Sequence, residues 1–287
     1  MTVQTSCIDR ATQRTARSRT HAEFVEIAGE RILVHSYRPA GAPEGPILIL
    51  FAGYERNGED YMRRARRAAR RHQSFVLAPV LDADRFPPSR YQRAGAGRRP
   101  PDAGSAHGMG AFVAQLVHWA RARDGRCSAP VILFGHSAGA QMLSRVAAYW
   151  GMSGAQRIVL ANPSSYVAPS GVERSPYGFA GDHDVVERDR RIQAYLALPM
   201  TIYLGSEDTG AHLLDARPAA MRQGINRLDR GRRIYAQGRA LAAARGWRFG
   251  WRLVVAEGVE HSSRGMLAAP ELDDALAGLN AIRLSSP

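Results

Sequence analysis

The sequence contains no lysine, only two cysteines and no long apolar run. All 39 basic residues of the 287 are therefore arginines, and with 26 acidic residues they give a formal net charge of +13. No stretch approaches the ~20 consecutive apolar residues that a membrane-spanning helix needs. The two cysteines, Cys7 and Cys127, indicate neither a disulfide framework nor a zinc site, and we expect a free structural thiol at Cys127.

A large positive charge is typical of proteins that bind nucleic acid or another anionic surface. However, the arginines spread along the whole chain, and the complete absence of lysine, beside abundant Ala and Gly, indicates a codon bias toward G and C. The densest cluster, within residues 63–71, leaves Met62 and several alanines on one face of a predicted helix. A solvated helix face explains this cluster, so we do not expect nucleic acid as a partner.

The amino-terminal segment, residues 1–22, is polar and has no apolar centre. It carries Arg10, Arg14, Arg17 and Arg19, and it does not resemble a secretory signal. We expect a disordered tail there, with a cytoplasmic location by default. The whole chain is 45% hydrophobic and 23% charged, which is ordinary for a globular protein. Residues 23–287 are therefore expected to form one large domain.

Strands and helices alternate along this domain. An antiparallel hairpin is predicted at residues 24–27 and 31–34, and buried strands at 47–51, 75–79, 131–134, 157–161, 200–204 and 251–256. Helices are predicted at 59–72, 110–123, 141–150, 218–245 and 271–282. This order implies an α/β fold with a mainly parallel central sheet, helices on both faces and the hairpin at one edge. Residues 80–108 form a long polar loop, and residues 163–198 form a second excursion that we expect to contribute a cap.

The most informative motif is Gly-His-Ser-Ala-Gly at residues 135–139. It matches G-x-S-x-G, a sharp turn between a strand and a helix that lifts the serine hydroxyl above the sheet. The apolar run before it and the helical pattern after it supply the context that the motif requires. The two glycines have a physical reason, because side chains at 135 and 139 would collide in such a tight bend. Ser137 is therefore the predicted nucleophile.

A serine hydroxyl is a weak nucleophile until a base takes its proton, and the base needs a third group to orient it. Loops at the carboxyl ends of parallel strands should carry both groups. His261, shortly after strand 251–256, is the predicted base, because the order Ser…Asp/Glu…His requires a late histidine. Asp208, after strand 200–204, is the predicted acid. Competitors are Glu207, Asp182 and Asp184 for the acid, and His107, His183 and His212 for the base.

Two backbone N–H groups should stabilise the negative oxygen of a tetrahedral intermediate. One belongs to the residue after the nucleophile, Ala138, and the other to the loop after an earlier strand. That loop begins Ala52-Gly53-Tyr54, so the N–H of Tyr54 is the predicted second donor. One donor of this kind contributes about 3 kcal/mol to transition-state stabilisation.

The chain resembles the α/β-hydrolase fold family over roughly residues 24–283. The resemblance lies in the strand order, in the turn at 135–139 (the nucleophile elbow), and in Asp208, His261 and Gly53-Tyr54. Where the family often has His-Gly at the oxyanion loop, this chain has Ala52-Gly53. Within the family the chain is similar to bacterial esterases related to polyhydroxyalkanoate depolymerases, through residues 206–209 and 246–261. A serine nucleophile disfavours the dehalogenases and epoxide hydrolases of this fold, which use aspartate.

The resemblance implies a cofactor-free, metal-free serine hydrolase that cleaves a small-molecule or oligomeric carboxylic ester. Asn162, Ser165 and Tyr166, after strand 157–161, are candidates for substrate binding, although an ordinary turn explains the same residues. A thioester or an amide substrate on the same residues remains open, and so does a non-catalytic, arginine-rich binding protein on this fold. Residues 182–184, Asp-His-Asp, are expected to be a solvated loop and not a cation site.

Overall fold

The computed structural model describes residues 17–41, 44–97, 101, 108–181 and 184–277. Its strands are β1 (Arg19–Ile27), β2 (Glu30–Arg38), β3 (Ile47–Phe51), β4 (Phe75–Val80), β5 (Val131–His136), β6 (Arg157–Ala161), β7 (Met200–Gly205) and β8 (Arg252–Ala256). Its helices are α1 (Gly58–Arg71), α2 (Met109–Asp124), α3 (Ala138–Trp150), α4 (Val185–Ala197), α5 (Pro218–Met221), α6 (Arg227–Arg245), α7 (Ser263–Ala268) and α8 (Leu272–Leu276).

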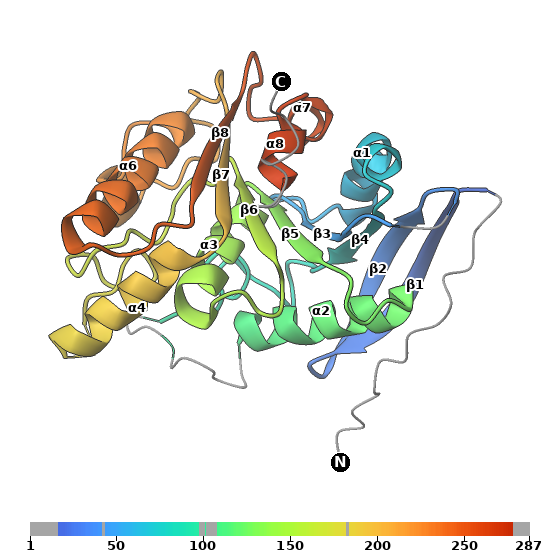
Figure 1. Ribbon diagram of the computed structural model, residues 1–287, viewed down its shortest axis with the longest axis horizontal. Helices are drawn as coiled ribbons and strands as arrows, with labels where there is room; N and C mark the ends of the chain where they lie inside the picture. The colour runs from blue at the N-terminus through green and yellow to red at the C-terminus, as the bar shows by residue number, and fades with distance from the viewer. Residues whose placement is uncertain (1–16, 42–43, 98–100, 102–107, 182–183, 278–287) are drawn as a thin grey trace.

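The strands form one sheet in the order β1-β2-β4-β3-β5-β6-β7-β8 (Figure 1). β1 pairs antiparallel with β2 and β2 with β4, while the pairs from β4 to β8 are parallel. The chain passes from β4 across β3 to β5, so the strand order reverses at the centre of the sheet. In open parallel sheets, ligand sites form outside the carboxyl ends of the strands at such a reversal.

Alternation along the central strands divides the core between the two faces of the sheet. In β3, Ile47, Ile49 and Phe51 belong to the cluster under α2, α3, α4 and α6, while Leu48 and Leu50 belong to the cluster under α1, α7 and α8. Figure 1 shows these two groups of helices on opposite sides of the sheet. All five residues of β3 are buried, which explains the continuous apolar run that predicts a doubly covered strand. The fold class expected from the sequence is confirmed.

The element boundaries differ from the predictions in several places. β1 begins at Arg19, so residues 19–22 are strand and not part of a disordered tail; Arg19 pairs with Arg38 of β2. The long helix predicted at 218–245 is divided, because α5 ends at Met221 and α6 begins at Arg227. Of the predicted helix at 271–282, Leu272–Leu276 form α8, which Ala277 ends, and residues 278–282 lie outside the described residues. Helix α7, which follows His261, was not predicted.

The arginine cluster on α1 is a solvated helix face, as expected. Met62 and the alanines at 65, 68 and 69 are buried, whereas Arg63 and Arg67 are exposed. Asp60 on the same helix forms ion pairs with Arg63 and Arg64. The arginines of α1 thus lie off its buried face, and two of them pair with Asp60.

Cys127, in the turn before β5, is disulfide-bonded, so the expectation of a free thiol there is wrong. Two widely separated cysteines carry no spacing signal from which a bond could be predicted, and the other cysteine, Cys7, lies outside the described residues. Disulfides persist mainly in oxidising compartments, so this bond does not favour the expected cytoplasmic location. Among the described helices, none combines the length and apolar character that crossing a membrane requires.

Candidate active site

The elbow is formed at the carboxyl end of β5. Ser137 has φ +53° and ψ −112°, a left-handed conformation that is strained for a residue with a side chain. Two hydrogen bonds hold this backbone: the Ser137 N–H donates to the Ala161 carbonyl at 2.9 Å, and the Gln141 N–H donates to the Ser137 carbonyl at 2.9 Å. The serine therefore lies above the sheet edge, directly before the first turn of α3.

The two glycines of the motif permit close approach in different directions. A Cβ atom at Gly135 would lie 2.6 Å from the backbone of Gly139 and of Ala140, across the bend as expected. A Cβ atom at Gly139 would instead overlap the carbonyl of Phe51 and lie 2.8 Å from that of Ala52. The second glycine therefore allows α3 to pack against the end of β3, which also begins the predicted oxyanion loop.

Hydrogen bonds connect the loop after β7 to the loop after β8, and this brings Asp208 and His261 to the same edge of the sheet. Gly205 ends β7, and any Cβ atom there would overlap the carbonyl of Val259 in the β8 loop. The Glu207 N–H donates to the same carbonyl at 3.0 Å, and the Gly258 N–H donates to Ser206 Oγ at 2.8 Å. These contacts fold the β8 loop over the end of β7.

His261 bridges the serine and the aspartate. Its Nε2 lies 3.0 Å from Ser137 Oγ, and its Nδ1 lies 2.7 Å from Asp208 Oδ2. The Asp208 side chain is 1% exposed and that of His261 26% exposed. The imidazole therefore has one nitrogen on a buried carboxylate and the other on the serine hydroxyl, the arrangement in which it can take a proton from serine.

The competitors lie elsewhere or outside the described residues. Glu207 is exposed, and its carboxylate accepts a hydrogen bond from Ser206 Oγ. Asp184 caps the amino terminus of α4 through the Glu187 N–H. His212 is exposed, and its carbonyl accepts a hydrogen bond from Arg227. Asp182, His183 and His107 fall outside the described residues.

The predicted oxyanion donors come from the elbow and from the loop after β3. Ala138 begins α3, and Tyr54 follows β3 in the adjacent loop. Among the described residues, neither of these N–H groups has a hydrogen-bond partner. The N–H of Gly53, in contrast, donates to the Tyr61 hydroxyl at 2.9 Å and is not free to bind an oxyanion. A Cβ atom at Gly53 would lie 3.7 Å from that of Ser137, which places this loop beside the serine.

Three side chains that the sequence did not single out support the oxyanion loop. Tyr61 from α1 accepts the Gly53 N–H and lies 2.8 Å from His136 Nδ1, so it joins the loop to the elbow. Tyr91 donates to the Ala52 carbonyl at 2.7 Å. Arg56 lies over the Tyr91 ring at 3.7 Å and donates to the Gly53 carbonyl at 3.4 Å. Burial lowers the pKa of Arg56 and raises that of Tyr61.

The three residues predicted to bind substrate are wholly enclosed in the structure. Asn162, Ser165 and Tyr166 each have 0% exposure. The Asn162 Oδ1 accepts the Gly205 N–H at 2.9 Å, which ties β6 to β7, and Ser165 Oγ accepts a hydrogen bond from Arg145 at 3.0 Å. These contacts are structural, and a contact with substrate stays a prediction.

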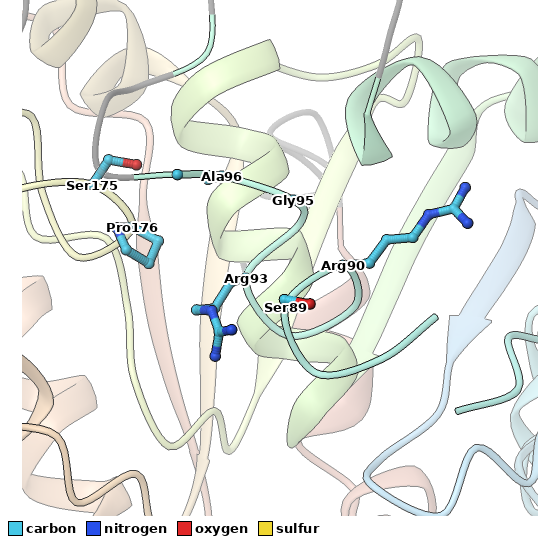
Figure 2. Close-up of a pocket in the computed structure, with 8 residues that line it drawn as sticks. Ser89, Arg90, Arg93, Gly95, Ala96, Ser175 and Pro176 are labelled. Atoms are coloured by element: carbon cyan, nitrogen blue, oxygen red, sulfur yellow. The ribbon is translucent and has the colours of Figure 1, made fainter. Parts of the chain in front are cut away.

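Beside the oxyanion loop, the segment that contains Tyr91 lines a cavity of about 530 Å³. Figure 2 shows Ser89 and Arg93 on one side of it and Ser175 and Pro176 on the other. Arg90 is held at the surface by Glu30, 2.7 Å away. The side chain of Arg93 makes no hydrogen bond or ion pair with any described residue.

Comparison with known proteins gives structural relatives. No protein-family model matches the sequence, and no curated protein matches it. The poly(3-hydroxybutyrate) depolymerase LpqC from Bordetella parapertussis is 31% identical, with a TM-score of 0.77 and 87% of each chain covered. The chain belongs to the α/β-hydrolase fold family.

Two further relatives agree with this assignment. Poly(aspartic acid) hydrolase-1 from Sphingomonas sp. KT-1 is 29% identical, with a TM-score of 0.75, and the match covers 88% of this chain and 96% of that one. An esterase from Pyrobaculum calidifontis is 16% identical, with a TM-score of 0.50, covers 90% and 81%, and shows the shared fold alone. The two relatives near 30% identity are a depolymerase and a hydrolase, which supports hydrolase activity.

Proposed function

We propose that the protein is a serine hydrolase that cleaves carboxylic esters through an acyl-enzyme on Ser137. The observation that carries the proposal is the position of His261, whose two ring nitrogens lie 3.0 Å from the serine hydroxyl and 2.7 Å from the Asp208 carboxylate. Ser137, His261 and Asp208 are then the nucleophile, the base and the orienting acid.

The geometry supports the following reaction. Ser137 Oγ attacks the ester carbonyl while His261 Nε2 takes the hydroxyl proton, and Asp208 stabilises the imidazolium through the Nδ1–H. The N–H groups of Tyr54 and Ala138 donate to the oxyanion of the tetrahedral intermediate. Collapse of the intermediate breaks the bond to the alkoxide, which takes the proton from Nε2 and leaves as an alcohol. Water, deprotonated by His261, then attacks the acyl-enzyme and releases the acid and Ser137.

The substrate class is a small-molecule or oligomeric ester. The cavity of about 530 Å³ in Figure 2 adjoins the segment that supports the oxyanion loop, and it offers room for a further unit of an oligomer. The reaction as written uses only side chains and backbone of this chain and water. The segment at 163–198, whose Ser165 Oγ accepts a hydrogen bond from Arg145 of α3, is proposed as part of a cap.

A panel of nitrophenyl esters of increasing acyl length, with thioester and anilide analogues, tests the proposal. We expect ester hydrolysis by the wild type, covalent labelling of Ser137 by a fluorophosphonate, and loss of both in Ser137→Ala. Preferred cleavage of the thioester or anilide would replace the ester by that substrate class. A folded wild type that hydrolyses none of the analogues and takes no label would overturn the enzyme proposal. Salt-dependent binding of nucleic acid that Ser137→Ala leaves intact would then favour the binding protein.

A further inference from the structure

Asp208 has a second charged partner on the side away from His261. Arg227, the first residue of α6, lies with Nη1 3.4 Å from Asp208 Oδ1, and both side chains are 1% exposed. The other carboxylate oxygen, Oδ2, faces His261 at 2.7 Å. The carboxylate therefore lies between a buried guanidinium and the imidazole, with one oxygen directed to each.

The guanidinium also holds the turn that follows Asp208. Its Nη2 donates to the His212 carbonyl at 2.6 Å and its Nη1 to the Gly210 carbonyl at 3.4 Å. The backbone at the start of α6 adds a contact, because the Leu228 N–H lies 3.4 Å from the Asp208 carbonyl. The planar fork of arginine can make these contacts at once, whereas a lysine ammonium could not reproduce their geometry.

We propose that Arg227 is a positioning residue for Asp208. Its guanidinium holds Oδ1 so that Oδ2 faces His261, and its charge limits how strongly the carboxylate stabilises the protonated imidazole. Burial lowers the pKa of Arg227 and the Asp208 carboxylate opposes that shift, but an arginine side chain stays charged in proteins. This inference rests on the proposed function, since it assigns a role within the same site.

The other groups around the pair are neutral or lie on other elements. Tyr166, from the segment after β6, is buried near Asp208, and burial holds its pKa well above the ordinary value. His136 of β5 stacks on His261, and Arg64 of α1 donates a hydrogen bond to Ser263 two residues beyond His261. Apart from His261 itself, Arg227 is thus the only basic side chain within hydrogen-bonding distance of the Asp208 carboxylate among the described residues.

The test compares Arg227→Gln with Arg230→Gln. Arg230 is a matched control because it is also wholly buried and near the start of α6, but its guanidinium donates to the carbonyls of Ser164, Asp215 and Gly224 and not to Asp208. In Arg227→Gln the positive guanidinium that repels the protonated His261 ring is absent, so the imidazolium becomes more stable. The acid limb of the kcat/KM profile should therefore move to higher pH by about half a unit or more. We expect kcat to fall about tenfold at neutral pH, with KM changed by less than about twofold.

Arg230→Gln is expected to keep the wild-type pH profile, even where its stability falls. Arg227→Lys keeps the charge, so it should keep the acid limb near that of the wild type while kcat falls about threefold, because the fork geometry is lost. If Arg227→Gln does not fold, Arg227→Lys decides: wild-type kcat in that variant overturns the positioning role. A folded Arg227→Gln with wild-type kcat and pH profile, altered only in stability, also overturns it.

A second readout does not depend on turnover. The Cε1 proton resonance of His261, assigned by its loss in His261→Gln, reports protonation of this ring directly. The proposal expects the imidazolium signal of Arg227→Gln to persist to higher pH than that of the wild type, and an identical titration contradicts it. Absence of wild-type activity and labelling would instead contradict the proposed function, so the two failures can be told apart.

Discussion

The imidazole rings of His136 and His261 lie face to face, with centroids 5.0 Å apart and planes inclined by 29°. His136 is 4% exposed, and its Nδ1 lies 2.8 Å from the Tyr61 hydroxyl. The same hydroxyl accepts the Gly53 N–H, so Tyr61 connects the buried His136 ring to the oxyanion loop. Burial, followed by the nearby charges of His261, Arg227 and Arg64, lowers the pKa of His136 well below its ordinary value of 6.5.

This depressed pKa predicts a loss of stability in mild acid. Below about pH 6.5 the unfolded chain binds a proton at His136 that the folded chain does not bind, so the free energy of unfolding falls by up to about 1.4 kcal/mol per pH unit until the folded pKa is reached. His136→Gln should lack this contribution. Urea denaturation at about pH 7 and about pH 5.5 measures it, and equal pH dependence in the two proteins would contradict the prediction.

One added methyl group at Gly139, the second glycine of the elbow, should strongly reduce both stability and kcat. In Gly139→Ala the Cβ atom overlaps the carbonyl of Phe51, a rigid backbone group at the end of β3. We expect a loss of about 1–3 kcal/mol or more in unfolding free energy and a strong fall in kcat, because the elbow and the oxyanion loop must separate. Gly210→Ala is the control, since nothing lies within 4 Å of its Cβ position. Similar stability of the two variants would refute this account.

The sequence was most informative where a chemical requirement acts along the chain. The order of strands, the turn at 135–139 and the need for a late histidine lead to Ser137 and His261 without knowledge of contacts, and the structure brings these side chains within 3.0 Å. Tyr61 and Arg227 could not be found in this way. No motif precedes them, and each contributes through a tertiary contact that the local pattern does not reveal, Tyr61 with His136 and Arg227 with Asp208.

Gly231 and Gly238 lie inside α6, although glycine is unfavourable in the middle of a helix. A Cβ atom at Gly231 would lie 2.6 Å from Leu204 and 2.7 Å from the Tyr166 hydroxyl, and one at Gly238 would lie 3.0 Å from Trp251. Close packing of the helix on β7 and β8 therefore requires small residues there, and tertiary contacts outweigh the local cost.

Loss of the Tyr61 hydroxyl should lower kcat while KM changes little. Tyr61→Phe removes the acceptor of the Gly53 N–H and the hydrogen-bond partner of His136 Nδ1, and leaves both buried groups without a partner. We expect about 1–3 kcal/mol of lost stability and a lower kcat, because the oxyanion loop loses its tie to the elbow. KM for a short ester should change little. Wild-type kcat in a Tyr61→Phe enzyme of reduced stability would show that the hydroxyl serves folding alone.

The proposed oxyanion donor at residue 54 is a backbone group, which distinguishes it from the exposed aromatic ring of the same residue. Tyr54 is 54% exposed. Tyr54→Ala should therefore keep the N–H and a kcat within about twofold of the wild type. Tyr54→Pro removes the N–H, and kcat should fall about 10²–10³-fold. Circular dichroism of both variants checks that they fold. If Tyr54→Ala loses as much activity as Tyr54→Pro, the ring and not the N–H is responsible, and the second donor must be sought elsewhere in the loop after β3.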